Sequence, residues 1–110
     1  MKIDLASLTI FSSLFMPALG MIGYQCDRDI IPSELVENAI RGSYKYLYEE
    51  QYDKLINFDV EDKINVVLSH QSRFGEDYSF WASHNKWGDL IGVFYRDGTF
   101  DRDCYTVPFN

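Results

Sequence analysis

The chain contains only two cysteines, Cys26 and Cys104, and most of its length lies between them. In an oxidising compartment such a pair is expected to form a disulfide, which closes a small fold end to end. Two other uses, a catalytic thiol and a metal ligand, lack support. Neither cysteine has a second ligand at the spacing of a zinc site, and the two histidines, His70 and His84, stand alone. The compartment therefore decides what the pair does.

The N-terminal segment indicates an oxidising compartment. Its parts are a positive start at Lys2, an apolar run over 5–16, a break at Pro17, and small residues at Ala18 and Gly20. The apolar run is shorter than the roughly 20 residues that a membrane-spanning helix needs, and no second run follows. We expect a cleaved secretory signal peptide at 1–20 and a secreted domain at 21–110 without a membrane anchor. The alternative is a buried N-terminal strand or helix.

Secretion predicts that Cys26 and Cys104 form a disulfide. With 46% hydrophobic and 25% charged residues the chain has enough apolar side chains for a small core. A domain of this size benefits from a covalent link. Removing 1–20 takes away one cation, Lys2, and one anion, Asp4, so the net charge of the remaining chain is still −7. That charge disfavours salt-driven binding of nucleic acids as a class.

The periodicity of apolar residues predicts one helix followed by strands. Residues recurring at three- and four-residue intervals predict a helix from Ser33, expected as its N-cap, to about Glu50. Turn signals stand at 85–89 and at Asp97-Gly98. The expected strands are Lys54–Phe58, Lys63–Ser69, Tyr78–Ser83, Leu90–Arg96 and Cys104–Phe109. The predicted fold class is α+β: a single domain with one α-helix packed on one face of an antiparallel sheet.

A set of short motifs resembles one known family. The set comprises Tyr24-Gln25-Cys26 near the start of the expected mature chain, Ile31-Pro32, the helix, the strand-rich body with Tyr78-Ser79-Phe80-Trp81, and the lone C-terminal Cys104. In order and spacing it resembles the RNase-like secreted effectors of powdery mildew fungi, over nearly the whole expected mature chain. The resemblance implies a fold similar to the microbial guanyl-type ribonucleases, with the helix on a curved antiparallel sheet. It also implies a role in suppressing plant defence from inside the host cell.

The acid–base residues that such a ribonuclease uses are replaced in this chain, whereas Tyr52 retains the family's tyrosine. Cleavage through the 2′-hydroxyl needs a general base, a general acid and a cation near the phosphate. The resemblance places the family's catalytic Tyr, first His, base Glu and Arg near Tyr52, Lys54, Asn65 and Tyr78, respectively, and its acid His near Arg96 or Tyr95. Asparagine does not titrate, and arginine stays protonated at neutral pH. The chain is therefore expected to be a pseudo-ribonuclease with no catalytic residues, no metal and no cofactor.

Other candidate acid–base groups have a simpler interpretation. His70 follows an expected strand and His84 stands at an expected turn, so both are predicted to be exposed loop histidines. If either one had taken over catalysis, the protein would be an active ribonuclease with a relocated histidine. The carboxylate pairs Glu61-Asp62 and Glu76-Asp77 are adjacent loop residues, which is typical of solvated charge.

The number of aromatic side chains exceeds what a small core needs. Candidates for the surface are Tyr44, Tyr46, Tyr48, Tyr52, Trp81 and Trp87. Exposed rings stack nucleobases in single-strand binders, or anchor protein interfaces. A local patch of Lys45, Lys54 and Arg96 would favour RNA, whereas the net charge of −7 favours a protein partner.

These observations together predict a secreted fungal virulence effector that binds a host plant protein and does not act as an enzyme. A plant immune receptor is one candidate partner. The expected binding loops are 58–63, 71–77 and 98–103. The alternative is a pseudoenzyme that binds and protects host RNA, which makes RNA the second, weaker candidate partner.

Overall fold

A computed structural model describes residues 22–109 and has an α+β fold with two antiparallel sheets. The expected signal peptide and its cleavage point lie outside the described residues. The elements are β1 (Ile22–Cys26), β2 (Asp29–Pro32), α1 (Ser33–Glu50), α2 (Tyr52–Ile56), β3 (Ile64–Val67), β4 (Tyr78–His84), β5 (Leu90–Asp97), β6 (Phe100–Asp103) and β7 (Tyr105–Pro108). One sheet has the strand order β2-β1-β7 and the other the order β3-β4-β5-β6. The α+β class is confirmed, but the single sheet expected from the sequence divides into two.

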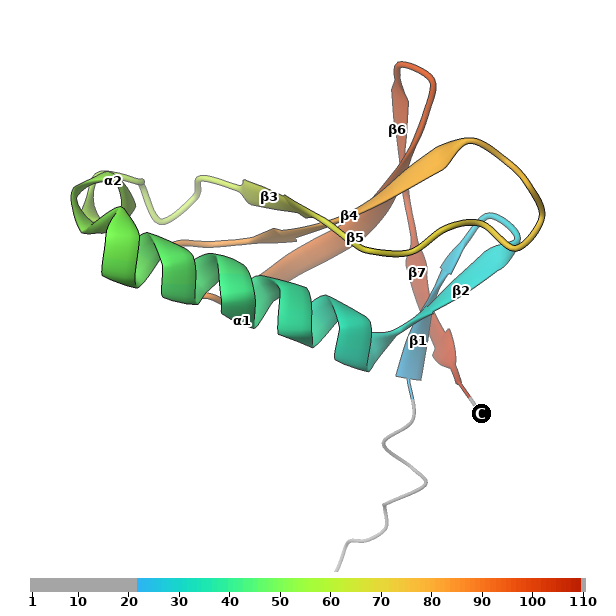
Figure 1. The fold of residues 1–110 in the computed structure, drawn as a ribbon, viewed down its shortest axis with the longest axis horizontal. Coiled ribbons are helices and arrows are strands. Elements are labelled where there is room, and N and C mark those ends of the chain that lie inside the picture. The colour runs from blue at the N-terminus through green and yellow to red at the C-terminus, as the bar shows by residue number, and fades with distance from the viewer. Residues whose placement is uncertain (1–21, 110) are drawn as a thin grey trace, which may run out of the picture.

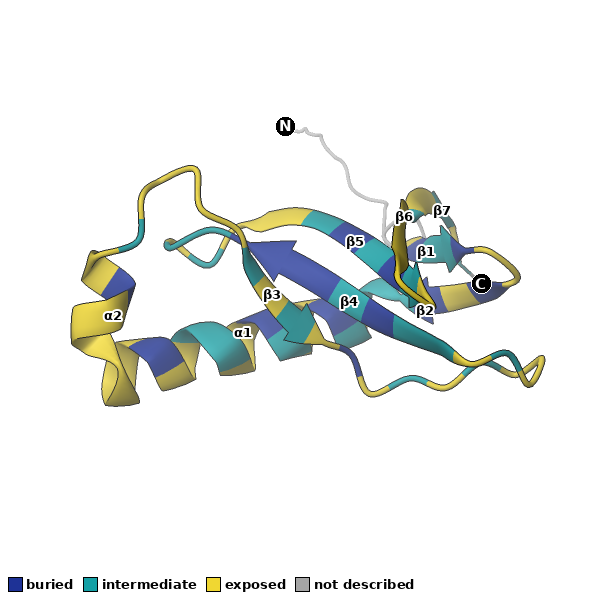
Figure 2. Ribbon diagram, turned by 90° about the horizontal axis from the view of Figure 1, so that it is seen from above, coloured by how far each residue is buried: buried dark blue, intermediate teal, exposed yellow. Residues whose placement is uncertain are grey.

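The helix α1 lies along one face of the four-stranded sheet, and the β5–β6 hairpin rises on the opposite side (Figure 1). The buried residues of α1 are Val36, Ile40 and Leu47, which recur at the helical period. On β4, Phe80, Ala82 and His84 are fully buried and alternate with residues directed away from the helix. Figure 2 shows burial concentrated along β4 and exposure along β6. The core therefore lies between α1 and the inner face of β4 and β5, and it includes Cys26 of β1 and Ile31 of β2.

The expected disulfide is confirmed: Cys26 at the end of β1 is bonded to Cys104, with a Cα–Cα distance of 4.6 Å. Cys104 stands between β6 of one sheet and β7 of the other, and its amide donates to the carbonyl of Val93 in β5. The disulfide therefore links the two sheets at the point where the chain passes from one to the other.

The prediction of a strand at Lys54–Phe58 is wrong, because residues 52–56 form the short helix α2. Leu55 is the one buried residue of α2, and α2 contacts α1. The segment therefore buries a single apolar side chain and does not show the alternating burial of a strand. Ser33 is not the N-cap either. Pro32 occupies that position with an extended backbone, and no side chain caps the helix.

Three strands carry no strand signal in the sequence. In β1, Gly23 is required because a Cβ there would come within 2.7 Å of Ile30 Cγ2. Strand β2 ends in Pro32, and every residue of β6 is exposed. The prediction of a binding loop at 98–103 is wrong, because most of this segment forms strand β6. The Asp97-Gly98 turn is confirmed as the β5–β6 hairpin, with Gly98 at φ +66°.

The loop 71–77 is confirmed as a loop, and it is fastened to the β1–β2 turn by three consecutive residues. Asp27 accepts a hydrogen bond from the Tyr78 hydroxyl at 2.8 Å, Arg28 forms an ion pair with Glu76 at 3.1 Å, and Asp29 accepts from the Arg73 amide at 3.1 Å. Glu76 is therefore a partner in an ion pair, not the solvated charge that the sequence suggested. These contacts hold the loop against the three-stranded sheet.

Candidate functional site

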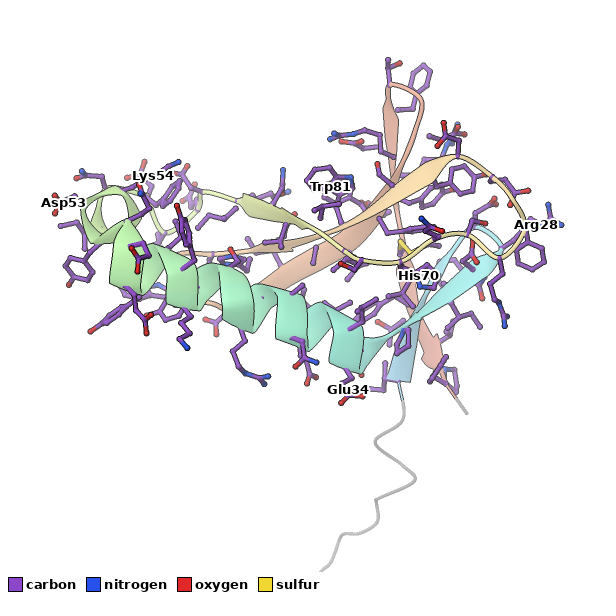
Figure 3. The ribbon with its side chains drawn as sticks, viewed as in Figure 1. Arg28, Glu34, Asp53, Lys54, His70 and Trp81 are labelled. Atoms are coloured by element: carbon purple, nitrogen blue, oxygen red, sulfur yellow. A yellow bond between two sulfur atoms is a disulfide. The ribbon has the colours of Figure 1, made fainter. Side chains whose placement is uncertain are left out.

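The surface opposite α1 on the four-stranded sheet, called the open face below, displays an aromatic and arginine stack. Trp81 of β4 is paired with Phe94 of β5, and their rings stack at 6.1 Å with an interplanar angle of 8°. The guanidinium of Arg96 lies over the Trp81 ring at 5.0 Å. Figure 3 shows Trp81 projecting from the side of the sheet away from the helix. Because β4 and β5 are regular strands, residues two apart on each are directed to this same face.

Arg96 is held in place by a second contact. Its Nε and Nη2 donate to the two carboxylate oxygens of Asp101 on β6, at 2.7 and 3.2 Å. This pairing lowers the pKa of the Asp101 carboxyl and raises the pKa of the guanidinium. The two-point contact fixes the plane of the guanidinium above the indole. The Arg96–Asp101 pair has no net charge.

A cleft of about 530 Å³ continues the open face beyond the stack. Its polar lining includes Lys63, Asn65, Ser83, Asp101 and Asp103. Ser83 donates to the Asn65 amide oxygen at 2.7 Å, which fixes that side chain at the floor of the cleft. The cleft is thus lined by an amide, a hydroxyl, one ammonium group and two carboxylates.

Only two of the five degenerate ribonuclease positions reach this face. Asn65 on β3 and Arg96 on β5 do, but Asn65 pairs with Ser83 and Arg96 pairs with Ser79. Four residues along β4 separate these pairs, which is about 13 Å of strand. Tyr78 is directed to the core side, where its ring packs edge-on against Phe80 and Tyr95. Tyr52 and Lys54 are in α2 and belong to no strand. The five positions therefore do not form one constellation.

The prediction that both histidines are exposed is wrong. His84 has no exposed surface, because its ring lies between β4 and α1. Its Nδ1 donates to the carbonyl of Asn85 at 2.7 Å, since a carbonyl oxygen can only accept, and Nε2 lies 2.8 Å from the Ser43 hydroxyl on α1. A serine beside a histidine is the arrangement of an activated nucleophile, yet a buried ring cannot meet a substrate. The pair instead fastens the helix to the sheet.

His70 is mostly buried on the same side of the sheet as the helix. Its ring packs edge-on against Phe80 at 5.1 Å, and Nε2 lies 3.9 Å from the buried carboxylate of Asp29. In Figure 3 His70 lies beside the β1–β2 hairpin, away from Trp81. Both histidines of the chain are therefore directed away from the cleft that carries Asn65 and Ser83.

The expected cationic patch does not assemble. Lys45 and Lys54 stand on α1 and α2, whereas Arg96 lies on the open face and is paired with Asp101. Several of the aromatic residues singled out from the sequence are indeed exposed. They are Tyr46, Tyr48, Tyr52 and Trp87. Tyr44, Tyr48 and Tyr52 form a row of contacting rings with centroid distances of 6.1 and 5.4 Å.

Tyr24 of the family-like motif lies in β1 and packs against the core. Burial, with a smaller contribution from the charge of Glu37, raises the pKa of its phenol. Tyr24 is therefore a structural residue that packs against the buried cluster to which Cys26 belongs.

The hydrogen bond from Tyr78 to Asp27 predicts a specific dependence on alkaline pH. That bond, together with burial, raises the pKa of Tyr78 to about 12. Because the folded value lies above the unfolded value of about 10, the stabilisation is present below about pH 10 and is lost as the pH rises through about 12. Spectroscopic titration of the phenols should show a transition near pH 12 that disappears in Tyr78→Phe. Tyr105→Phe, at an exposed position on β7, is the control, and an unchanged titration curve in Tyr78→Phe would refute the assignment.

No protein-family model, curated protein or solved structure matches this chain. Within residues 22–109 no helix is long and apolar enough to cross a membrane. The same described residues contain no group of three His, Cys, Asp or Glu side chains placed to hold a metal ion.

Proposed function

We propose that this protein is a secreted fungal effector with a ribonuclease-like fold that binds a host plant protein and does not cleave RNA. The α-helix packed on an antiparallel sheet and the disulfide between Cys26 and Cys104 are compatible with that fold. Binding would block or displace a component of plant defence inside the host cell. The face that carries the interaction is the open face, where a ribonuclease of this fold would hold its substrate.

One observation carries the proposal. The open face presents the Trp81–Phe94–Arg96 stack, while His70 and His84 are packed on the opposite face of the sheet, which is the helix side. Acid–base cleavage of RNA at neutral pH needs groups that titrate near neutrality and touch the substrate. The stack offers instead the residue types that dominate the energetics of protein interfaces.

The charges of the open face favour a protein over RNA. Asp101 neutralises Arg96, and Asp103 adds a further carboxylate to the cleft beside Lys63. A phosphate chain entering the cleft would meet both carboxylates, in a protein of net charge −7. A protein surface with its own hydrogen-bond donors meets no such repulsion.

RNA binding without cleavage is the second candidate, and the Trp81 ring beneath Arg96 is the observation that favours it. A flat ring next to a guanidinium is a stacking platform for a nucleobase. This candidate predicts saturable binding to single-stranded RNA that weakens steeply with salt. Absence of binding at low salt would eliminate it.

The experiment that separates a binding module from an enzyme is a cleavage assay with the purified, oxidised protein. Its substrates are a guanylyl dinucleotide and total RNA, with a microbial guanyl-type ribonuclease as the positive control. We expect no turnover above the uncatalysed rate. Turnover that disappears in His70→Ala or in His84→Ala, with the fold of each variant verified by circular dichroism, would make the protein a ribonuclease with a relocated histidine.

A further inference from the structure

The two sheets present four edge strands, and three of them carry features that block pairing with another chain. Strand β6 has the charged residues Asp101, Arg102 and Asp103, and β7 contains Pro108. Strand β2 contains Pro32, and the turn at its start is fastened to the loop 71–77. Charges, proline and covering loops are the usual protections of sheet edges. Strand β3, with the sequence Ile-Asn-Val-Val, has none of them.

The free side of β3 presents backbone groups at two positions. The Leu68 amide donates to the carbonyl of Phe80, so in the β3–β4 register the hydrogen-bonded residue pairs fall at Leu68, Val66 and Ile64. The amide and carbonyl groups of Asn65 and Val67 consequently point away from β4. No turn or loop hydrogen bond of residues 22–109 uses them.

The side chains of these same two residues are exposed, Val67 to 57%, and lie on the open face. Asn65 also lines the cleft beside Lys63. A strand added to β3 would therefore lie at the edge of the cleft. One alternating set of its side chains would be directed to the face that carries Trp81.

The charges around β3 select the occupant. The loop that leads into β3 exposes three carboxylates, Asp59, Glu61 and Asp62, against two cations: Lys63 at the end of the loop and Lys86, which lines the same pocket as the carboxylates. The carboxylates therefore outnumber the cations by one. A second copy of this chain would bring its own net charge of −7 to the same edge and be repelled. A segment with Lys or Arg at its end would be attracted.

We propose that β3 is a docking edge for an extended segment of a partner protein, which adds a fifth strand to the four-stranded sheet. The segment has apolar or β-branched residues in alternation and Lys or Arg beside the acidic loop 59–62. This inference rests on the proposed function, since it assumes a protein partner, and it specifies how that partner is held. Main-chain hydrogen bonds to Asn65 and Val67 supply affinity, and contacts with Val67 supply selectivity.

The test uses two synthetic peptides of alternating valine and threonine, one flanked by lysines and the other by glutamates. Amide hydrogen exchange of the folded, oxidised protein is followed by NMR at about 1 mM peptide. We expect the lysine-flanked peptide to slow exchange at Asn65 and Val67 at least about tenfold and to bind at least about tenfold more tightly than the glutamate-flanked one. Absence of protection at these two amides, or protection only on other strands, would overturn the proposal.

Val67→Pro removes the outward-pointing amide without removing a bond of the β3–β4 ladder, so it should abolish protection at Asn65 while the melting temperature changes little. Val67→Thr keeps the amide and serves as the matched control. If Val67→Pro does not fold, the exchange result in the unmodified chain still decides. A concentration-dependent dimer that Val67→Pro abolishes would assign the edge to a second copy and overturn the proposal. Failure at β3 leaves the proposed function standing, because that function is tested separately at Trp81.

Discussion

Replacing Cys26 and Cys104 together by serine will lower the midpoint of thermal unfolding by about 10–25 °C. The bond closes a loop with a sequence separation of 78 residues, for which the chain-entropy model gives an upper value of about 4.5 kcal/mol. In a domain of this size each kcal/mol corresponds to roughly 4–8 °C. The disulfide also fixes β1 to the segment between β6 and β7, so its loss should loosen both sheets together.

The matched controls for this experiment are chemical and structural. Cys26 is fully buried, so serine adds a buried hydroxyl that the double alanine variant lacks. Reduction of the unmodified protein should reproduce the melting temperature of the double alanine variant. Circular dichroism scans of all three forms measure the effect. A midpoint within about 3 °C of the oxidised protein's would mean that the disulfide does not stabilise the fold.

Phe80→Ala will destabilise the protein by about 3–5 kcal/mol, whereas Trp81→Ala will cost only about 1 kcal/mol. These neighbours on β4 point to opposite sides of the sheet. Phe80 has no exposed surface and packs against the rings of His70 and Tyr78. Trp81 is half-buried on the open face, where its contacts with Phe94 and Arg96 and the hydrogen bond from its Nε1 to the Ser79 hydroxyl at 3.0 Å are lost.

Urea unfolding followed by circular dichroism gives both values, and the pair controls for the loss of a large ring at the centre of β4. If Trp81→Ala were as destabilising as Phe80→Ala, Trp81 would be a core residue. The open face would then lose its principal candidate for binding. The expected difference therefore makes Trp81→Ala a folded variant suitable for binding experiments.

The elements that the sequence predicted are those whose periodicity serves a single buried face. The spacing of Val36, Ile40 and Leu47 marks α1, and the alternation through Phe80 and Ala82 marks β4. Both patterns are local, because the residues that produce them belong to one element. The disulfide could also be predicted from the sequence, since two cysteines allow only one pairing.

The elements that were missed depend on contacts between distant segments. Gly23 would ordinarily weaken a strand, but in β1 it makes room for the Ile30 side chain. Strand β6 pairs with β5, and Asp101 lies opposite Arg96 and accepts a hydrogen bond from it. Burial of His84 depends on Ser43, which lies in another element. No local pattern encodes these partners.

The candidate site was predictable in its residue types but not in its geometry. Trp81, Asn65 and Arg96 were recognised as notable in the sequence, but their common face follows from the register of β3, β4 and β5. A shift of one residue would direct Trp81 into the core and Phe80 to solvent. Tyr78 and Ser79 illustrate this dependence on register. Ser79 pairs with Arg96 and lies on the open face, whereas the preceding residue, Tyr78, lies on the core side.

The measurement that tests the central claim most directly is quantitative capture of plant proteins by the immobilised, oxidised protein. Leaf extract is treated with ribonuclease beforehand, so that RNA cannot bridge the two. The unmodified chain is compared with Trp81→Ala and with Tyr105→Phe, a substitution at an exposed position of β7 in the three-stranded sheet. We expect at least one plant protein whose recovery falls tenfold or more, by about 1.4 kcal/mol of binding free energy, in Trp81→Ala and is unchanged in Tyr105→Phe. Equal recovery of every captured protein by all three forms would contradict the claim that the open face binds a host protein.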